Sequence, residues 1–252
     1  MSMTAKCWMR PFHQGVLLTG ALLGWPLANA QTIHAVTETT PYTYLKEGRV
    51  VGSATEVVEK TLLAAGQWDH QVKLYPWARA YDMALNTPNV LIFLIARTAA
   101  REPQFQWVGE IMKIQYHLYR LRSRDDISVT KLVDAKNYTI GVLRDDVRQQ
   151  YLQLKGFTRV AVSAQWIDNF NKLLNRQVDL LPLTEDDASS LCEKAQFNCA
   201  GLVQVLTLDE ASTGLYMAYS QSTPDEVVIK TRAAFSKLKE EGAVKRIMNK
   251  KP

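Results

Sequence analysis

The chain is poor in cysteine and lacks the motifs of metal-dependent and nucleotide-binding proteins. Only three of its 252 residues are Cys, and none of them stands near a His or a second Cys pair at zinc spacing. There is no Gly-rich phosphate-binding loop and no Ser, His and Asp order with a nucleophile elbow. We therefore expect no metal, no cofactor and no catalytic residue of these classes.

A strong excess of charge is also missing. Lys and Arg number 30 against 25 Asp and Glu, a net charge of +5, and no basic stripe is interleaved with aromatic residues. A nucleic-acid-binding surface would need such a stripe. The composition therefore argues against a nucleic-acid partner.

The first 30 residues contain no acidic residue. Lys6 and Arg10 precede an apolar run over residues 15–27, and Ala28-Asn29-Ala30 follows with a small-x-small pattern. The run is short for a bilayer-spanning helix, and Pro26 interrupts it. Residues 1–30 are therefore predicted to be a cleaved secretory signal peptide; an uncleaved anchor is the alternative.

The cysteines agree with export. Cys7 lies in the predicted signal peptide, so the exported chain keeps Cys192 and Cys199. An even pair in an exported protein predicts a disulfide that closes a short loop. Two free thiols are the alternative.

From residue 32 onward, strand patterns alternate with helix patterns. Strands are predicted at 32–38, 70–77 and 89–96, and helices at 53–66 and 78–86. Ser53 is expected to cap the first helix in a capping box with Glu56, and Gly66 to end it. This alternation predicts a parallel sheet with crossover helices.

The same order then starts again without clear residue identity. Strands are predicted at 116–123, 138–143, 158–164 and 178–183, with helices at 144–156 and 166–177. A single long helix is predicted over 222–251, capped by Ser222 or Thr223, with Pro224 in its first turn. Because no Gly/Ser linker separates the halves, we expect two α/β lobes packed against each other.

Five segments resemble, in the right order, motifs of one protein family. The family is the periplasmic solute-binding proteins of the polar amino-acid ABC transporter type (bacterial extracellular solute-binding protein family 3). The segments cover residues 41–62, 97–111, 132–152, 173–183 and 218–250. The resemblance implies an α/β, two-lobed periplasmic-binding-protein fold of type II, with lobes joined by two crossing segments and a ligand trapped between them. Lobe 1 would comprise residues 31–113 and 213–252, and lobe 2 residues 114–212.

The resemblance assigns the ligand's carboxylate to an Arg at the end of an apolar strand. In the family, the Arg of a Thr-x-x-Arg element pairs with the α-carboxylate; here these are Thr98 and Arg101. A guanidinium fork matches a carboxylate with two parallel hydrogen bonds. Arg101 could instead pair with an acidic neighbour at the surface. For Arg97, a second anion contact and a structural salt bridge stay open.

Two aromatic residues and a further Arg are candidates for the wall of the same pocket. Trp77 matches a region that lines the pocket in relatives, and Arg79 follows it; Tyr42 is a similar candidate. An aromatic ring there could stack on a flat or cationic part of the ligand. A place in the hydrophobic core is the alternative for Trp77 and Tyr42.

Lobe 2 departs from the family pattern. The loop that usually donates backbone N–H groups to the carboxylate reads Leu143-Arg144-Asp145-Asp146, and its two Asp could cap the following helix or attract a cation. The family's amine-binding Asp falls on Thr184. The usual amine anchor is therefore missing or displaced.

The resulting prediction is a monomeric, non-enzymatic periplasmic binding protein. It would capture a small polar, carboxylate-bearing molecule and deliver it to an inner-membrane ABC permease. An enzyme on the same scaffold, similar to cyclohexadienyl dehydratases, is the alternative and would need a general acid such as Glu185, His34, His70 or His117. A ligand-sensing module is the third hypothesis.

Overall fold

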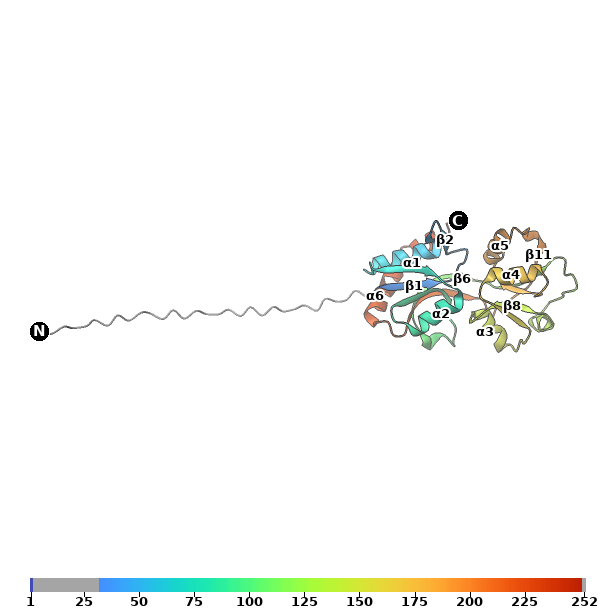
Figure 1. The fold of residues 1–252 in the computed structure, drawn as a ribbon, viewed down its shortest axis with the longest axis horizontal. Helices are drawn as coiled ribbons and strands as arrows, with labels where there is room; N and C mark the ends of the chain where they lie inside the picture. The colour runs from blue at the N-terminus through green and yellow to red at the C-terminus, as the bar shows by residue number, and fades with distance from the viewer. Residues whose placement is uncertain (2–31, 251–252) are drawn as a thin grey trace. The chain divides into compact units, whose positions relative to one another are not determined.

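The computed structural model describes residue 1 and residues 32–250. The predicted signal peptide lies outside the described residues. Figure 1 shows the remaining elements gathered in two lobes, with α1, α2 and α6 in one and α3, α4 and α5 in the other.

Lobe 1 contains a five-stranded sheet in the order β4-β1-β5-β12-β6. Its first three strands, β4 (His70–Leu74), β1 (Ile33–Thr37) and β5 (Val90–Ala96), are parallel, as the strand–helix alternation predicted. β12 (Thr213–Ser220) runs antiparallel to both β5 and β6 (Phe105–Ile114). The short strands β2 (Tyr44–Lys46) and β3 (Arg49–Val51) form a separate antiparallel pair.

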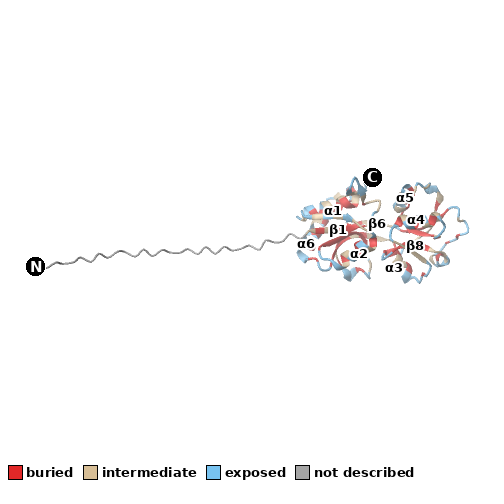
Figure 2. Ribbon diagram, in the orientation of Figure 1, coloured by how far each residue is buried: buried red, intermediate tan, exposed pale blue. Residues whose placement is uncertain are grey.

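Four helices belong to this lobe. They are α1 (Ser53–Ala64), α2 (Trp77–Asn86), α6 (Asp225–Glu240) and α7 (Ala243–Met248), and the 3-10 turn η1 (Glu102–Gln104) precedes β6. α1 packs against α6 and α7, whereas α2 packs on β5 and β1. Every residue of β5 is buried, as expected from its continuous apolar sequence. Figure 2 shows the buried strands of both lobes enclosed by half-exposed helices.

In lobe 2, β7 (His117–Leu121) lies between β10 (Leu181–Leu183) and β11 (Leu202–Thr207), antiparallel to both. β8 (Ile140–Leu143) and β9 (Val160–Ser163) are parallel, and a bridge from Ile140 to Leu180 joins them to this group. The helices are α3 (Val147–Leu154), α4 (Trp166–Leu174) and α5 (Glu185–Lys194), with 3-10 turns η2 (Leu132–Asn137) and η3 (Cys199–Gly201).

The chain passes between the lobes twice. β6 leads into β7 through Gln115 and Tyr116, and β11 returns to β12 through residues 208–212. Thr213 pairs with Ile114, so the two passages lie beside each other. The predicted two-lobed fold with two crossing segments is confirmed, and the lobe bounds given above remain a prediction.

The predicted cap of the first helix is wrong. Ser53 is the first residue of α1 rather than its cap; the cap is Gly52 at φ 127, and no side chain caps the helix. A side chain is disfavoured at Gly52, since a Cβ there would lie 2.2 Å from the carbonyl oxygen of Tyr42. The predicted capping box therefore does not form.

The predicted C-terminal helix is two helices. Gly242, in the left-handed conformation at φ 70, caps α7 and separates it from α6. Pro224 caps α6 in place of Ser222 or Thr223. The Thr223 hydroxyl instead accepts a hydrogen bond from the backbone N–H of Asn89, 3.0 Å away.

Cys192 and Cys199 form the predicted disulfide, with their Cα atoms 5.5 Å apart. It joins α5 to η3. Among the described residues, no helix is long and apolar enough to cross a membrane.

Candidate ligand-binding site

The inner chamber, a cavity between the lobes, encloses about 560 Å³ of space, part of it open to solvent. Lobe 1 supplies the ends of β1 and β5 and the start of α2; lobe 2 supplies the starts of α3, α4 and α5. Ligands of open α/β sheets bind outside such strand ends. Its lining residues are Thr37, Glu38, Thr40, Tyr42, Trp77, Leu94, Ala96, Arg101, Ile114, Tyr116, Asp146, Val147, Arg148, Trp166, Thr184, Asp187 and Leu215.

Arg101 is a buried cation without a carboxylate partner among the described residues. Only 1% of its surface is exposed, and its backbone N–H donates to the Thr98 carbonyl in the turn after β5. The guanidinium donates to the carbonyls of Ala96 (3.3 Å) and Asp145 (2.9 Å), while Nε has no partner in the described part of the chain. A buried guanidinium held only by neutral oxygens is positioned to receive an anion.

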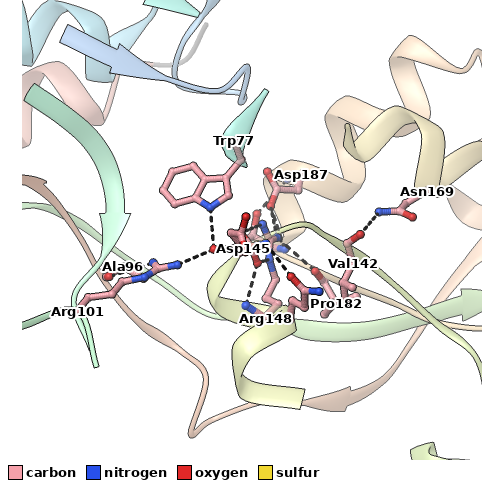
Figure 3. A network of polar contacts seen from close by, with 12 residues as sticks. Trp77, Ala96, Arg101, Val142, Asp145, Arg148, Asn169, Pro182 and Asp187 are labelled. Carbon is pink, nitrogen blue, oxygen red and sulfur yellow. Dashed lines mark hydrogen bonds and ion pairs between the residues drawn. The ribbon is translucent and has the colours of Figure 1, made fainter. Parts of the chain in front are cut away.

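Trp77 and Arg101 meet at the same lobe 2 atom. The indole N–H of Trp77 donates to the Asp145 carbonyl at 3.0 Å, and Figure 3 shows both side chains directed at this oxygen. The Arg101 guanidinium also lies 5.6 Å from the Trp77 ring centroid and 4.9 Å from that of Tyr81. These contacts join the lobes beside the cavity.

The lobe 2 wall is dominated by a buried ion pair. Asp146 caps α3, and its two carboxylate oxygens accept from Nε and Nη2 of Arg148 at 2.6 and 2.9 Å. Arg148 is 4% exposed and lies 4.0 Å from the Trp166 ring centroid and 4.7 Å from that of Tyr116. Although burial raises the pKa of Asp146, the Arg148 guanidinium and its hydrogen bonds hold it below its usual range.

A second carboxylate of lobe 2 faces the same cavity from α5. Thr184 caps this helix and forms a capping box with Asp187, whose carboxylate lies 3.6 Å from Arg148. Burial raises the pKa of Asp187 despite the attraction of Arg148. Thr184, the position that matches the family's amine anchor, thus lines the cavity, and the acidic Asp187 lies one helical turn beyond it in α5. Figure 3 shows Asp187 beside Arg148.

Glu38, directly after β1, is the acidic group of lobe 1. It is half-buried, and its carboxylate has no hydrogen-bond or ion-pair partner among the described residues. Burial raises the pKa of Glu38 to about 8, and the carboxylates of Asp146 and Asp187 add to this rise against the guanidinium of Arg148. The site therefore holds one unpaired cation and one unpaired acid.

Several predicted site residues lie outside the inner chamber. Arg97 forms a two-pronged ion pair with Glu102 (2.7 and 2.6 Å) and lies over the rings of Trp107 and Tyr216. This ion pair is of the kind named above as the structural alternative, and an anion contact of Arg97 stays a prediction.

Thr98 shapes the turn that carries Arg101, and Arg79 lies over the Tyr75 ring at 4.6 Å. Arg144 is exposed, and Asp145 contributes its backbone carbonyl rather than its carboxylate. Tyr42 does line the cavity, and its hydroxyl donates to the Asp186 carboxylate across the lobes.

Sequence reasoning missed twelve residues of the cavity, and five of these carry a charge or a large aromatic ring. These five are Glu38, Tyr116, Arg148, Trp166 and Asp187. Glu38 could have been found, because an acidic residue directly after a parallel strand lies where such sheets bind ligands. Arg148 and Trp166 carry no comparable local signal. No group of three or more His, Cys, Asp or Glu in the described part of the chain could hold a metal ion.

Comparison with known proteins finds similarity in structure but not in sequence. No protein-family model and no curated protein matches the chain. A histidine kinase sensor domain with similarity to periplasmic binding proteins superposes with a TM-score of 0.76 at 15% identity, covering 86% of this chain and 94% of the other.

Two amino-acid-binding proteins give similar values. The arginine-, lysine-, histidine-binding protein ArtJ of Geobacillus stearothermophilus has a TM-score of 0.72 at 17% identity, covering 86% and 93%. AbpA of Streptococcus pneumoniae, an amino acid ABC transporter substrate-binding protein bound to L-arginine, has a TM-score of 0.72 at 15% identity, covering 86% and 92%. The chain therefore has the two-lobed fold of the periplasmic binding proteins.

Proposed function

We propose that this protein is a periplasmic solute-binding protein. It captures, between its lobes, a small amino-acid-like molecule that carries a carboxylate and a basic group, and it hands this ligand to an inner-membrane ABC permease. The observation that carries the proposal is the pair of unpaired groups in the inner chamber, the Arg101 guanidinium and the Glu38 carboxyl group.

The charges of the cavity favour a ligand with a basic group. The inner chamber contains two cationic residues, Arg101 and Arg148, and three acidic ones, Glu38, Asp146 and Asp187. Asp146 and Arg148 already form an ion pair with each other. A ligand carboxylate would form an ion pair with Arg101, while a ligand ammonium or guanidinium would form ion pairs with Glu38 and Asp187. ArtJ and AbpA, which have the same fold, bind arginine or other basic amino acids, and this supports L-arginine as the first probe.

One observation favours an enzyme as the second candidate. A dehydratase-type reaction needs a general acid in the cleft, and Glu38, with its pKa raised to about 8, is such a group. Glu185, His34, His70 and His117, named above for this role, do not line the inner chamber. A ligand recovered unchanged after prolonged incubation, as followed by proton NMR, would exclude the enzyme.

Calorimetric titration of the refolded protein with L-arginine tests the proposal. Arg101→Ala should weaken binding by about 30-fold to several thousand-fold, or about 2–5 kcal/mol, because the ligand carboxylate then faces a low-dielectric cavity alone. Arg101→Lys should recover only part of this loss, since an ammonium cannot reproduce the fork.

Trp77→Phe is the matched control. It removes the other hydrogen bond to the Asp145 carbonyl while keeping an aromatic ring beside the cavity. This variant should weaken L-arginine binding by only a few-fold. An Arg101→Ala protein that is folded, by circular dichroism, and binds L-arginine no more weakly than Trp77→Phe would remove Arg101 as the anion anchor.

A further inference from the structure

A second cavity adjoins the inner chamber and is larger. This outer chamber encloses about 990 Å³, part of it open to solvent. Its walls come from both lobes: from the segment after β1 and the β4–α2 connection in lobe 1, and from the starts of α4 and the body of α5 in lobe 2. The residues are Glu38, Thr39, Thr40, Pro41, Leu74, Tyr75, Pro76, Ala164, Gln165, Trp166, Ile167, Asp187, Ser190, Leu191 and Lys194.

The two chambers adjoin each other and share part of their walls. Glu38, Thr40, Trp166 and Asp187 line both of them. The unpaired carboxyl group of Glu38 therefore stands at the boundary, whereas Arg101 lies on the inner side only. A ligand held by both groups points from the inner chamber toward the outer one.

Beyond this boundary apolar and polar side chains line the outer chamber together, and Lys194 adds one positive charge to its wall. Tyr75 and Pro76 line it from lobe 1, and the Arg79 guanidinium lies over the Tyr75 ring at 4.6 Å; Ile167 and Leu191 line it from lobe 2. The disulfide of Cys192 holds the end of α5 that carries Ser190 and Leu191.

The geometry points to a ligand that is longer than a free amino acid. It carries its carboxylate at Arg101, its basic group at Glu38 and Asp187, and an apolar or aromatic substituent in the outer chamber, as a dipeptide does. This inference rests on the proposed function, because the inner contacts set the direction of the ligand. Removing roughly 50 Å² of apolar surface from water raises affinity about tenfold, so an added aromatic side chain should be readily detected.

The test compares three probes by calorimetry on the full exported chain. They are L-arginine, L-phenylalanyl-L-arginine and L-arginyl-L-phenylalanine. At least one dipeptide should bind ten times or more as tightly as L-arginine. Ser190→Trp, which fills the outer chamber from α5, should abolish this advantage and leave L-arginine binding unchanged.

Ser189→Trp is the matched control, since Ser189 is the exposed neighbour on the same helix and does not line the cleft. Ser190→Gln, a smaller filling variant, repeats the test if the Trp variant fails to fold. Equal affinities for all three probes, or equal dipeptide affinities in the Ser190 and Ser189 variants, would overturn the inference. The outer chamber would then contribute no contact to ligand binding.

Failure of the inference can be distinguished from failure of the proposed function. In one outcome, L-arginine binds, Arg101→Ala loses this affinity, and neither dipeptide binds more tightly than L-arginine. The proposed function would then stand, and only the inference of a longer ligand would be wrong. If none of the three probes binds, the ligand chemistry itself is wrong, and both conclusions fall together.

Discussion

Within the described residues, Glu38 and Arg101 are the charged side chains of the inner chamber that lack a partner of opposite charge. Every other charged side chain of the inner chamber has a partner of opposite charge, as Asp146 and Asp187 have in Arg148. A half-buried acid beside two carboxylates keeps its proton until a cation arrives, because ionisation there is opposed by burial and by like charge. Ligand binding should therefore be coupled to proton release.

We expect L-arginine binding at pH 7 to release up to about one proton from Glu38. The free group, with its pKa raised to about 8, is mostly neutral at this pH, and a bound guanidinium would favour the ionised form. Affinity should therefore rise between pH 6 and pH 8. Calorimetry in buffers of different ionisation enthalpy measures the proton count.

Glu38→Gln is the control for this coupling, because the amide has a similar size and no proton to lose. It should bind more weakly at pH 8 and show no proton release. The folded-state pKa lies above the usual 4.5, so the wild type should also lose stability relative to Glu38→Gln as pH rises from about 5 to 8. Proton release that persists in the variant would assign the coupling to another group.

At the scale of elements, the turn between β8 and α3 determines how the lobes meet. Asp145 adopts φ 60, in the left-handed region, and this conformation presents its carbonyl to Trp77 and Arg101. Asp is among the few residues that adopt it readily, whereas a β-branched residue does so at a cost of about 1–2 kcal/mol.

Asp145→Val should therefore lower the free energy of unfolding by about 1–2 kcal/mol, and Asp145→Gly should change it by less than about 0.5 kcal/mol. Denaturant titration with circular dichroism measures both. Arg144→Val is the control, because Arg144 is exposed and lies outside the left-handed region. A Val that is tolerated equally at both positions would show that this backbone conformation carries no strain.

The elements themselves were largely predictable from the sequence, but not the site. The apolar run that became β5 and the apolar/polar alternation of β4 are local signals, so they could be assigned without tertiary information. β6 and β12 were not predicted as the long antiparallel pair that joins the lobes, since their pairing connects residues a hundred positions apart. The break at Gly242 was likewise missed within a helical pattern.

The site is harder because its charges come from separate elements. Thr98 and Arg101 could be identified from a motif, and Thr184 from its distance to a strand. The acidic group that faces the cavity from α5, Asp187, is one turn further on, and only the helix position reveals this. Arg148 is an Arg near a helix start, a pattern typical of solvent-exposed side chains, and only tertiary packing buries it against Trp166.

For the whole molecule, three side-chain hydrogen bonds join the two lobes across the cleft within the described part of the chain. Trp77 and Arg101 donate to the Asp145 carbonyl, and Tyr42 donates to Asp186. Each such bond contributes about 0.5–1.5 kcal/mol net. We therefore expect these bonds to favour contact between the lobes before a ligand adds its own contacts, and an open state to be reached by breaking few bonds.

The double variant Tyr42→Phe, Trp77→Phe should shift this equilibrium toward the open form by about 1–3 kcal/mol, because it removes two of these bonds and leaves the Arg101 anchor in place. Small-angle X-ray scattering of the ligand-free protein should show a larger radius of gyration, which saturating L-arginine reverses. The apparent affinity should fall in proportion to the closed population that is lost.

Tyr44→Phe is the control, since no hydrogen bond of the Tyr44 hydroxyl is found in the described part of the chain. A double variant with the scattering and affinity of the control would mean that these bonds form only with the ligand present, and that closure depends on the charges of Arg101 and Glu38 alone.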